Sequence, residues 1–346
     1  MATFQDSSLG TSTTVESTYG TGQTIARWYE FKSESLDYTK NTKQGQGMRV
    51  TTRVARSGRR TVPTFSVGGD FDMELVTKGM GVLWQWALGG TSTSTAVGSG
   101  FQQVHTLGTS VTAPALTFQK GIVNNAGTVV PFTFQGVSCS SFEINCPNGD
   151  IVDAKFSVFG RSIDQGTTAY VSPVMTANPV TPFTFLGGTI SVGTGALTAP
   201  TTIALASLAT PLNLSVRDFS LKVDNKLAVD RFNFGAAGKV AQPTDGLRDI
   251  SGSMTVEFDN LLSSALLSDT DLAVVLNFVS TEAIAGLAGG GFANFQIVLP
   301  AIRINSEVPK ADNTDLVTVK IDFDVLDNGS ATQPLWIIQQ TADSAL

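Results

Sequence analysis

Charged side chains are scarce in this sequence of 346 residues. Asp, Glu, Lys and Arg together make up 15% of the chain, against about 25% in a typical soluble protein. The formal net charge is −7, so the surface as a whole repels phosphate, and nucleic-acid binding is not expected as a primary role. A low charge content suits a surface that is buried against partners, because charged residues are depleted in interface cores.

Long apolar runs are also missing. No stretch reaches the roughly 18 consecutive apolar residues that a transmembrane helix requires. Residues 1–22 are rich in Ser, Thr and Gly and lack the basic and apolar regions of a secretory signal. We expect residues 1–27 to form a flexible arm.

Catalytic and metal-binding residue types are almost absent. The chain has one histidine, His105, and two cysteines, Cys139 and Cys146, too few for an ordinary zinc site. The cysteines lie seven residues apart on one predicted strand, which would point them to opposite faces, so we expect two buried thiols in a reducing compartment. No nucleophile elbow or Walker A motif occurs. The sequence predicts neither an enzyme nor a bound cofactor or metal.

Alternation of apolar and polar residues dominates what is present. It runs through residues 64–75, 250–258 and 316–325 and predicts long strands with one buried face. The clearest helix candidate is 79–88, which is apolar almost all round and is followed by two glycines. Such a helix should be buried against a sheet. These patterns indicate an all-β protein.

The two halves of the chain repeat one order of features. Residues 69–75 lead into the predicted helix, and residues 252–258 lead into a second, short helical candidate at 261–267. A later strand begins at Asp150 in the first half and at Asp315 in the second. We interpret this order as an internal duplication, with two tandem β-barrel or sandwich domains that each carry a short flanking helix.

The expected domain boundaries follow from this comparison. After the arm, residues 28–163 form the first β domain and residues 212–341 the second. Residues 164–211 are nearly free of charge and rich in Thr, Ala, Pro and Gly, and we expect a connector there with an extra hairpin. Residues 342–346 are a C-terminal tail.

Acidic residues cluster on one predicted strand face, with Asp70, Asp72 and Glu74 at alternate positions. Carboxylate groups of this kind occur in glycosidases and calcium sites. Side chains two apart on a strand are about 7 Å apart and project in parallel, so convergence on a ligand would need other elements. A solvated or pore-lining acidic face is the better interpretation.

Basic residues cluster between residues 40 and 60, where no acidic residue occurs. Arg49, Arg53 and Arg59 are expected on one strand face. No interleaved aromatics suggest nucleic-acid binding. The segment is either a solvated loop or an extension that docks on an acidic face of a neighbouring copy, and we favour docking. The basic residues are Lys40, Lys43, Arg49, Arg53, Arg56, Arg59 and Arg60.

The order of these features resembles that of the major tail tube proteins of long-tailed, siphovirus-type bacteriophages. The resemblance runs from about residue 28 to 341. It is carried by residues 35–37, the strand at 67–75, the helix at 83–89, and residues 135–142, 219–225 and 249–253. It is a pattern of small, apolar and acidic positions rather than one diagnostic motif.

The resemblance implies a structural virion protein whose copies join sheet edges into rings. Rings stack into the tail tube around a tape-measure protein, and DNA passes through the bore as transient cargo. Tail terminator and tail-tip proteins would be further partners, and assembly would occur in the host cytoplasm. The arm and the basic segment match the positions of elements that bridge stacked rings. Such families usually form hexameric rings, and a duplicated chain would give a trimer with pseudo-sixfold symmetry.

The acidic residues would then line the bore, because a negatively charged wall lets DNA slide without sticking. The lumen candidates are Asp70, Asp72, Glu74 and Glu257. Two alternatives remain open: another virion component, such as a tail terminator or head decoration protein, and a carbohydrate-binding or glycosidase β-sandwich.

Overall fold

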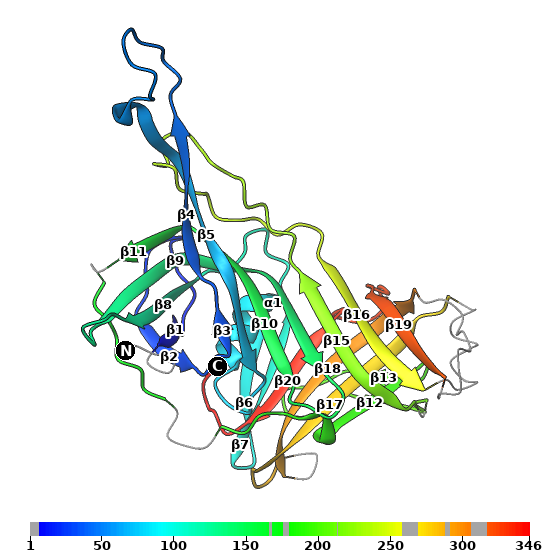
Figure 1. Ribbon diagram of the computed structural model, residues 1–346. Helices are drawn as coiled ribbons and strands as arrows, with labels where there is room; N and C mark the ends of the chain where they lie inside the picture. Colours follow the sequence, from blue (N-terminus) through cyan, green and yellow to red (C-terminus); the bar gives the residue numbers. More distant parts are fainter. Residues whose placement is uncertain are drawn as a thin grey trace.

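A computed structural model describes residues 7–165, 168–175, 180–212, 214–257, 269–287, 291–305 and 317–346. It confirms the all-β prediction, because long antiparallel strands dominate and the part of the chain described contains a single α-helix, α1 (Gly81–Leu88). The strands form a large sheet folded into two layers, with a long hairpin that projects from one end (Figure 1). The described strands do not close into a barrel, so the sandwich form of the prediction holds and the barrel form does not.

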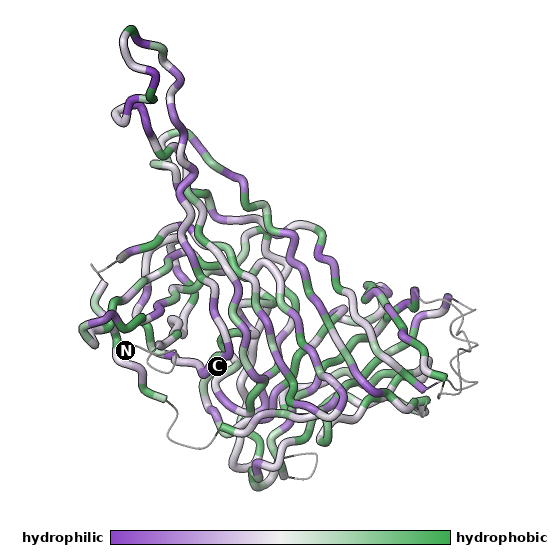
Figure 2. The backbone as a smooth tube through the Cα atoms, in the orientation of Figure 1, coloured by the Kyte–Doolittle hydropathy of each residue, from purple (hydrophilic) through white to green (hydrophobic). Residues whose placement is uncertain are grey.

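Most of the charged residues that lie in strands belong to the front layer. Its central order is β5–β10–β9–β15–β16–β19, all antiparallel. Hydrophilic and hydrophobic residues alternate along these strands (Figure 2), so one side faces the core and the other faces solvent. The strands are β3 (Ser33–Glu34), β4 (Asp37–Gln44), β5 (Arg60–Glu74), β9 (Val129–Cys146), β10 (Asp153–Gly160), β15 (Val216–Asp224), β16 (Asp249–Glu257) and β19 (Thr318–Val325).

The back layer has the order β12–β17–β18–β20–β7–β6. It joins the front layer where Ile302–Ile304 of β18 pair with β19. The central strands β18 and β20 are buried on both sides; β18 is accordingly mostly apolar, whereas β20 also buries Gln339 and Gln340. These strands are β6 (Gly89–Val97), β7 (Gly100–Leu107), β12 (Gly188–Gly193), β17 (Leu272–Ala283), β18 (Phe292–Ile304) and β20 (Trp336–Thr341).

Helix α1 lies between the two layers, as its apolar composition predicts. The Trp84 ring contacts Phe142 and Phe156 of the front layer, and it also contacts Phe295 of the back layer, with ring centroids 5.5–5.7 Å apart. All of these rings are buried in one continuous hydrophobic core. Gly89 ends the helix with φ 70°, a left-handed conformation that glycine adopts without strain. The helix therefore fastens the two layers together.

The N-terminal segment differs from the flexible arm expected for residues 1–27. Strand β1 (Ser8–Ser12) is buried and pairs on both sides, with β2 (Ile25–Tyr29) and with β8 (Leu116–Val123). Strand β8 pairs in turn with the first part of β9, which also pairs with β11 (Ser162–Gln165). Paired backbone groups and the burial of Leu9 hold this segment in place. Residues 1–6 lie outside the described part.

The two halves of the chain share one sheet, because β9 of the first half pairs with β15 of the second. Their strand registers agree with the alignment made from the sequence. In the first half Lys155 lies opposite Asp72, and in the second half Lys320 lies opposite Thr255, which is the aligned position. The second helical candidate, residues 261–267, lies outside the described residues.

From residue 185 to residue 211 the connector packs on the back layer. It contributes β12, the short turn η3 (Phe185–Gly187) and a small hairpin of β13 (Leu197–Thr198) and β14 (Ser207–Leu208). The Gln102 side-chain amide donates to the carbonyls of Thr201 and Ala204. The connector is thus part of the two-layer body.

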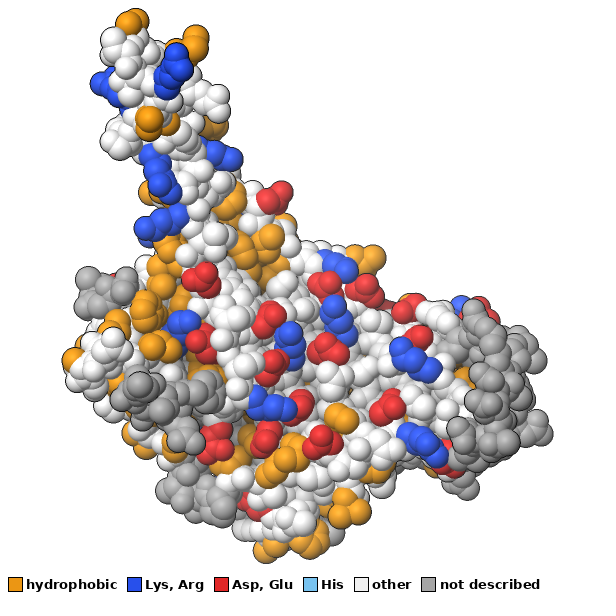
Figure 3. Space-filling model, viewed as in Figure 1, with side chains coloured by type: hydrophobic (Ala, Val, Ile, Leu, Met, Phe, Trp, Pro, Cys, Tyr) orange, Lys and Arg blue, Asp and Glu red, His pale blue; other side chains and the backbone are white. Residues whose placement is uncertain are grey.

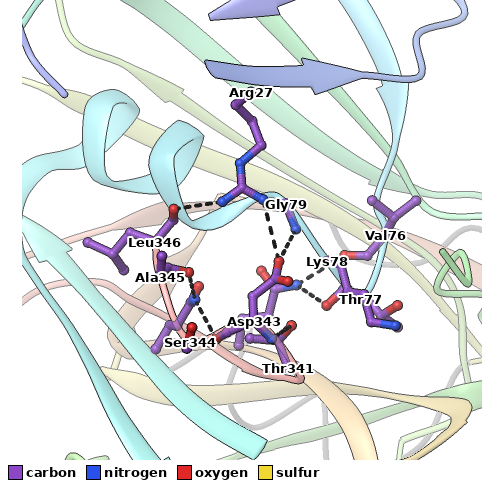
Figure 4. A network of polar contacts seen from close by, with 12 residues as sticks. Arg27, Val76, Thr77, Lys78, Gly79, Thr341, Asp343, Ser344, Ala345 and Leu346 are labelled. Atoms are coloured by element: carbon purple, nitrogen blue, oxygen red, sulfur yellow. Dashed lines mark hydrogen bonds and ion pairs between the residues drawn. The ribbon is translucent and has the colours of Figure 1, made fainter. Parts of the chain in front are cut away.

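The C-terminal residues are anchored rather than free (Figure 4). The Asp343 carboxylate accepts a hydrogen bond from the Gly79 backbone amide at 2.6 Å and lies 3.6 Å from the Arg27 guanidinium. Arg27 also donates to the carbonyl of Leu346, and Gln103 donates to that of Ala345. These contacts tie the C-terminal tail to β2, to β7 and to the segment just before α1.

The cysteine prediction was partly wrong. Cys139 and Cys146 are both free and buried, as expected, but both face the core. The register between β9 and β10 shifts between Ser157 and Val158, which inserts Ser140 as an extra residue on β9. This β-bulge reverses the alternation, so that two positions an odd distance apart share a face.

Candidate assembly surfaces

The solvent side of the six central front strands forms one continuous surface, which we call the charged face. Asp70, Asp72 and Glu74 project from β5, and Glu257 projects from β16, so all four lumen candidates lie on it. The strands between them bring these residues onto one surface although they are far apart in sequence. Figure 3 shows acidic and basic side chains gathered over these strands.

The charged face is predominantly but not purely acidic, because lysines and an arginine lie among its carboxylates. Lys155 pairs with Asp70 at 3.4 Å, and Arg217 pairs with Glu257 at 3.0 Å. Surface pairs of this kind contribute about 0–1 kcal/mol each. The charged residues on the face are Asp70, Asp72, Glu74, Glu143, Asp153, Asp218, Asp224, Asp249, Glu257, Asp322 and Asp324, against Lys155, Arg217, Lys222 and Lys320.

Opposite charges alternate across the strands in one row of this face, whereas in the next row Glu74 lies opposite Asp153. The row that begins at Asp72 continues through Lys155, Glu143 and Lys222. Opposite charges at directly facing positions stabilise antiparallel pairing. The sequence did not lead us to include the charged residues of β9, β10 and β15 in this face. The alternating pattern of those strands could have indicated that these residues face solvent. It could not have indicated that the strands lie beside β5.

The basic segment forms the end of the long β4–β5 hairpin, which extends beyond the body (Figures 1 and 3). At its base the rings of Tyr38 and Phe65 are 5.1 Å apart, and the Lys40 ammonium lies 6.0 Å from the Tyr38 ring. Near its tip Gln44 donates a hydrogen bond to the Arg56 carbonyl. The arms are therefore braced, and the basic side chains are carried away from the acidic body.

The tip itself is a loop followed by the short turn η2 (Ser57–Arg59). Arg49 and Arg53 lie in the loop and Arg59 lies in the turn, so the expectation that they share a strand face is wrong. Three apolar side chains, Met48, Val50 and Val54, are also largely exposed there. Exposed apolar groups beside cations are typical of a contact surface.

Both edges of the front layer are open over part of their length among the described residues. Strands β3 and β4 pair only with β5. At the far side of the front layer, residues 318–321 of β19 pair only with β16. Open edges present unpaired backbone donors and acceptors, which another chain can satisfy.

No metal-binding arrangement appears in the described residues. They contain no group of three or more His, Cys, Asp or Glu side chains placed to hold a metal ion. His105 lies fully buried on β7, where its Nδ1 is 2.7 Å from the Ser92 hydroxyl. Burial raises the pKa of the Cys146 thiol to about 11, so it is not a ready nucleophile. No described helix is long and apolar enough to cross a membrane.

Comparison with known proteins points to a family whose members assemble, in keeping with the open sheet edges. A family model described as phage tail tube protein matches residues 7–325. The chain belongs to the phage tail tube protein family. It is a structural component of the virion tail that self-assembles into a tube, as the sequence resemblance implied, although the match does not distinguish the siphovirus type. A search of curated proteins found no match.

The buried histidine predicts how the stability of this tail tube protein depends on pH. Burial lowers the pKa of His105 from 6.5 to about 3. Below pH 6.5 the unfolded chain binds a proton that the folded chain does not, so stability falls as the pH falls from 6.5 towards 3. At pH 5 the loss due to this residue should be about 2 kcal/mol.

Urea unfolding of unassembled protein at pH 7.5 and pH 5 measures this effect. The variant His105→Gln, which retains a side-chain group able to bond Ser92, should lose less stability than the wild type between the two pH values. Equal losses in the two proteins would show that His105 is not responsible.

Proposed function

We propose that three copies of the chain form a ring with pseudo-sixfold symmetry, that rings stack into the tube, and that the charged face lines the bore. The observation that carries the proposal is the β9–β15 junction, in which one half of the chain adds its edge to the other. The agreement of the two strand registers supports treating the halves as repeats.

The same junction can be repeated between copies. Strand β15 starts the second half, and its outer edge is occupied by β9. By the alignment, β3 and β4 are the first-half counterparts of β15, since they pair with β5 as β15 pairs with β16. Their outer edge is open among the described residues. We infer that the open edge at β19 of a neighbouring copy pairs with the open edge of β3 and β4. Repeating this pairing would close the sheet into a ring.

The charged face suits the inside of such a ring. It carries a large acidic excess, and several of its cations are engaged with neighbouring carboxylates. DNA that passes such a wall gains little from counterion release and is repelled overall, so it can move without being held. We propose that a tape-measure protein occupies the bore before DNA does.

The β4–β5 hairpin suits contact between stacked rings. It projects from one end of the front strands and is basic. The opposite end of the same strands is acidic, since Glu74, Asp150 and Asp153 surround Lys32 there. A hairpin that reaches the acidic end of the next ring would be steered by opposite charge. Tail terminator and tail-tip proteins would meet the two ends of the finished tube.

The number of chains in a ring tests the proposal directly. A cross-section of tubes assembled from purified protein, imaged by electron cryo-microscopy, should contain three chains that present six similar lobes. Six chains around the axis would overturn the trimeric ring.

Charge reversal at the hairpin should stop stacking. In the variant Arg53→Glu, Arg56→Glu, Arg59→Glu we expect folded protein with an unchanged circular-dichroism spectrum but a loss of sedimentable tubes, because the hairpin would be repelled by the acidic end. The matched variant with Lys at the same three positions keeps the charge and should form tubes. Tubes of normal length in the Glu variant would exclude bridging by this segment.

Charge reversal on the charged face should make the bore retain DNA. We expect tubes of the variant Asp70→Lys, Asp72→Lys, Glu74→Lys to bind linear duplex DNA at low salt and to release it as salt rises. The neutral variant Asp70→Asn, Asp72→Asn, Glu74→Gln should bind less. Closed circular DNA cannot thread a tube, so equal binding of circular and linear DNA would place these residues on the outside.

A further inference from the structure

The second half of the chain has a projection of its own, separate from the basic hairpin. Residues 225–248 connect β15 to β16 and occupy the position that the hairpin tip, 45–59, occupies between β4 and β5. We call them the second-half loop. Strands β5 and β15 are antiparallel in the same layer, so the start of β5 and the end of β15 lie at the same end of the molecule. The hairpin and this loop therefore project together (Figure 1).

The second-half loop is anchored firmly to the body. At its start the side-chain amide of Asn225 donates to the backbone carbonyls of Ala87 and Cys139, each at 3.0 Å. Towards its end the Asp245 amide donates to the Val111 carbonyl at 3.1 Å. Gly238 lies against the Pro63 carbonyl of β5, where an added Cβ would come within 2.7 Å.

The tip of this loop presents a phenylalanine to solvent. The Ala241 amide bonds to the Arg231 carbonyl, and a bridge joins Phe232 to Val240, so the tip is a small hairpin. Gly235 turns the chain with φ 82°. The Phe234 side chain is fully exposed at the turn. A braced backbone that holds a bare aromatic ring outwards is typical of an anchor for a partner surface.

A pocket of matching chemistry lies at the opposite end of the same strands. It has a volume of about 210 Å³ and lies at the start of β15, beside η3 and β12. A cavity of about 150 Å³ lined by apolar side chains can hold a benzene ring, so this pocket has room for a phenyl group. Its apolar lining includes Phe185, Leu186, Ile190, Val216, Phe219 and Phe278.

The charges beside the pocket and beside Phe234 are opposite. Asp218 lines the pocket, and Asp150 lies next to it, since its carbonyl accepts the Phe185 amide. Arg231 and Lys239 flank the loop tip, with Asp230 as the nearby acid. The loop end thus has a small positive excess and the pocket rim is acidic, which favours their approach.

We propose that Phe234 of one copy inserts into the pocket beside η3 of a copy in the next ring. The inference rests on the stacked-ring assembly proposed above and adds a second, chemically distinct contact to it. The first-half projection is strongly basic and exposes aliphatic side chains at its tip, whereas the second-half projection exposes a phenylalanine ring. Stacked rings would therefore distinguish the two halves, and their rotation would be fixed in threefold rather than sixfold steps.

Cysteine cross-linking tests this contact with the full-length chain. Phe234 and Leu186 are both highly exposed, whereas native Cys139 and Cys146 are buried. The nine residues of β15 separate the two sites by about 30 Å within one chain, and a disulfide requires Cα atoms within about 7 Å. In tubes of the variant Phe234→Cys, Leu186→Cys we expect disulfide-linked chain ladders under oxidising conditions.

The hairpin tip provides a matched control, because Met48 is equally exposed at the same end of the molecule. The variant Met48→Cys, Leu186→Cys should give no ladder. Ladders from this pair and none from the Phe234 pair would show that the hairpin, and not the loop, fills the pocket, and would overturn the inference.

Growth measurements separate this inference from the assembly on which it rests. We expect Phe234→Ala to raise the protein concentration needed for tube growth about tenfold or more, while Phe234→Leu has a smaller effect. Normal growth of Phe234→Ala, with no ladder from the Phe234 pair, would overturn the pocket contact and leave the stacked rings standing. Wild-type protein that forms no tubes at any concentration would overturn both.

Discussion

The main-chain pairing of β9 with β15 is the interaction on which the rest of this structure depends. It turns two similar sets of strands into one front sheet, and it aligns Glu143 with Lys222 across the boundary between the halves. Backbone hydrogen bonds do not depend on side-chain identity, so the same kind of junction can form wherever an edge and a partner strand meet. In this chain the junction holds the two halves together, and in the proposed ring the same kind of pairing would join neighbouring copies.

The hydrophobic core holds that sheet against the back layer. Trp84 of the buried helix contacts rings from both layers, so the front sheet cannot bend freely against the back one. The side of the sheet that faces away from the core is then left for charge. Acids outnumber the interspersed lysines there, so the surface as a whole is negative.

The two ends of the molecule are different, which is the requirement for a tube that grows head to tail. Both projections, the basic hairpin and the loop that carries Phe234, lie at one end, and the acidic cluster around Lys32 lies at the other. This polarity follows from the antiparallel order of the front strands, because each projection connects strands at the same end. Contacts between unlike surfaces propagate, whereas contacts between like surfaces close into dimers.

Much of this could be predicted from the sequence alone, and the physical reason is that the signals are local. Alternation along residues 64–75 determined a strand with one buried face, and the apolar residues of 79–88 determined a buried helix, because both depend only on near neighbours in the chain. The tertiary structure determined which strands are neighbours and which side chains share a face. It paired β1 into the sheet where an arm was expected, turned Cys139 and Cys146 to one side through a bulge, and placed lysines among the acids of the charged face. Those outcomes depend on pairing between segments that are distant in sequence, and a strand's own residues do not specify its neighbour.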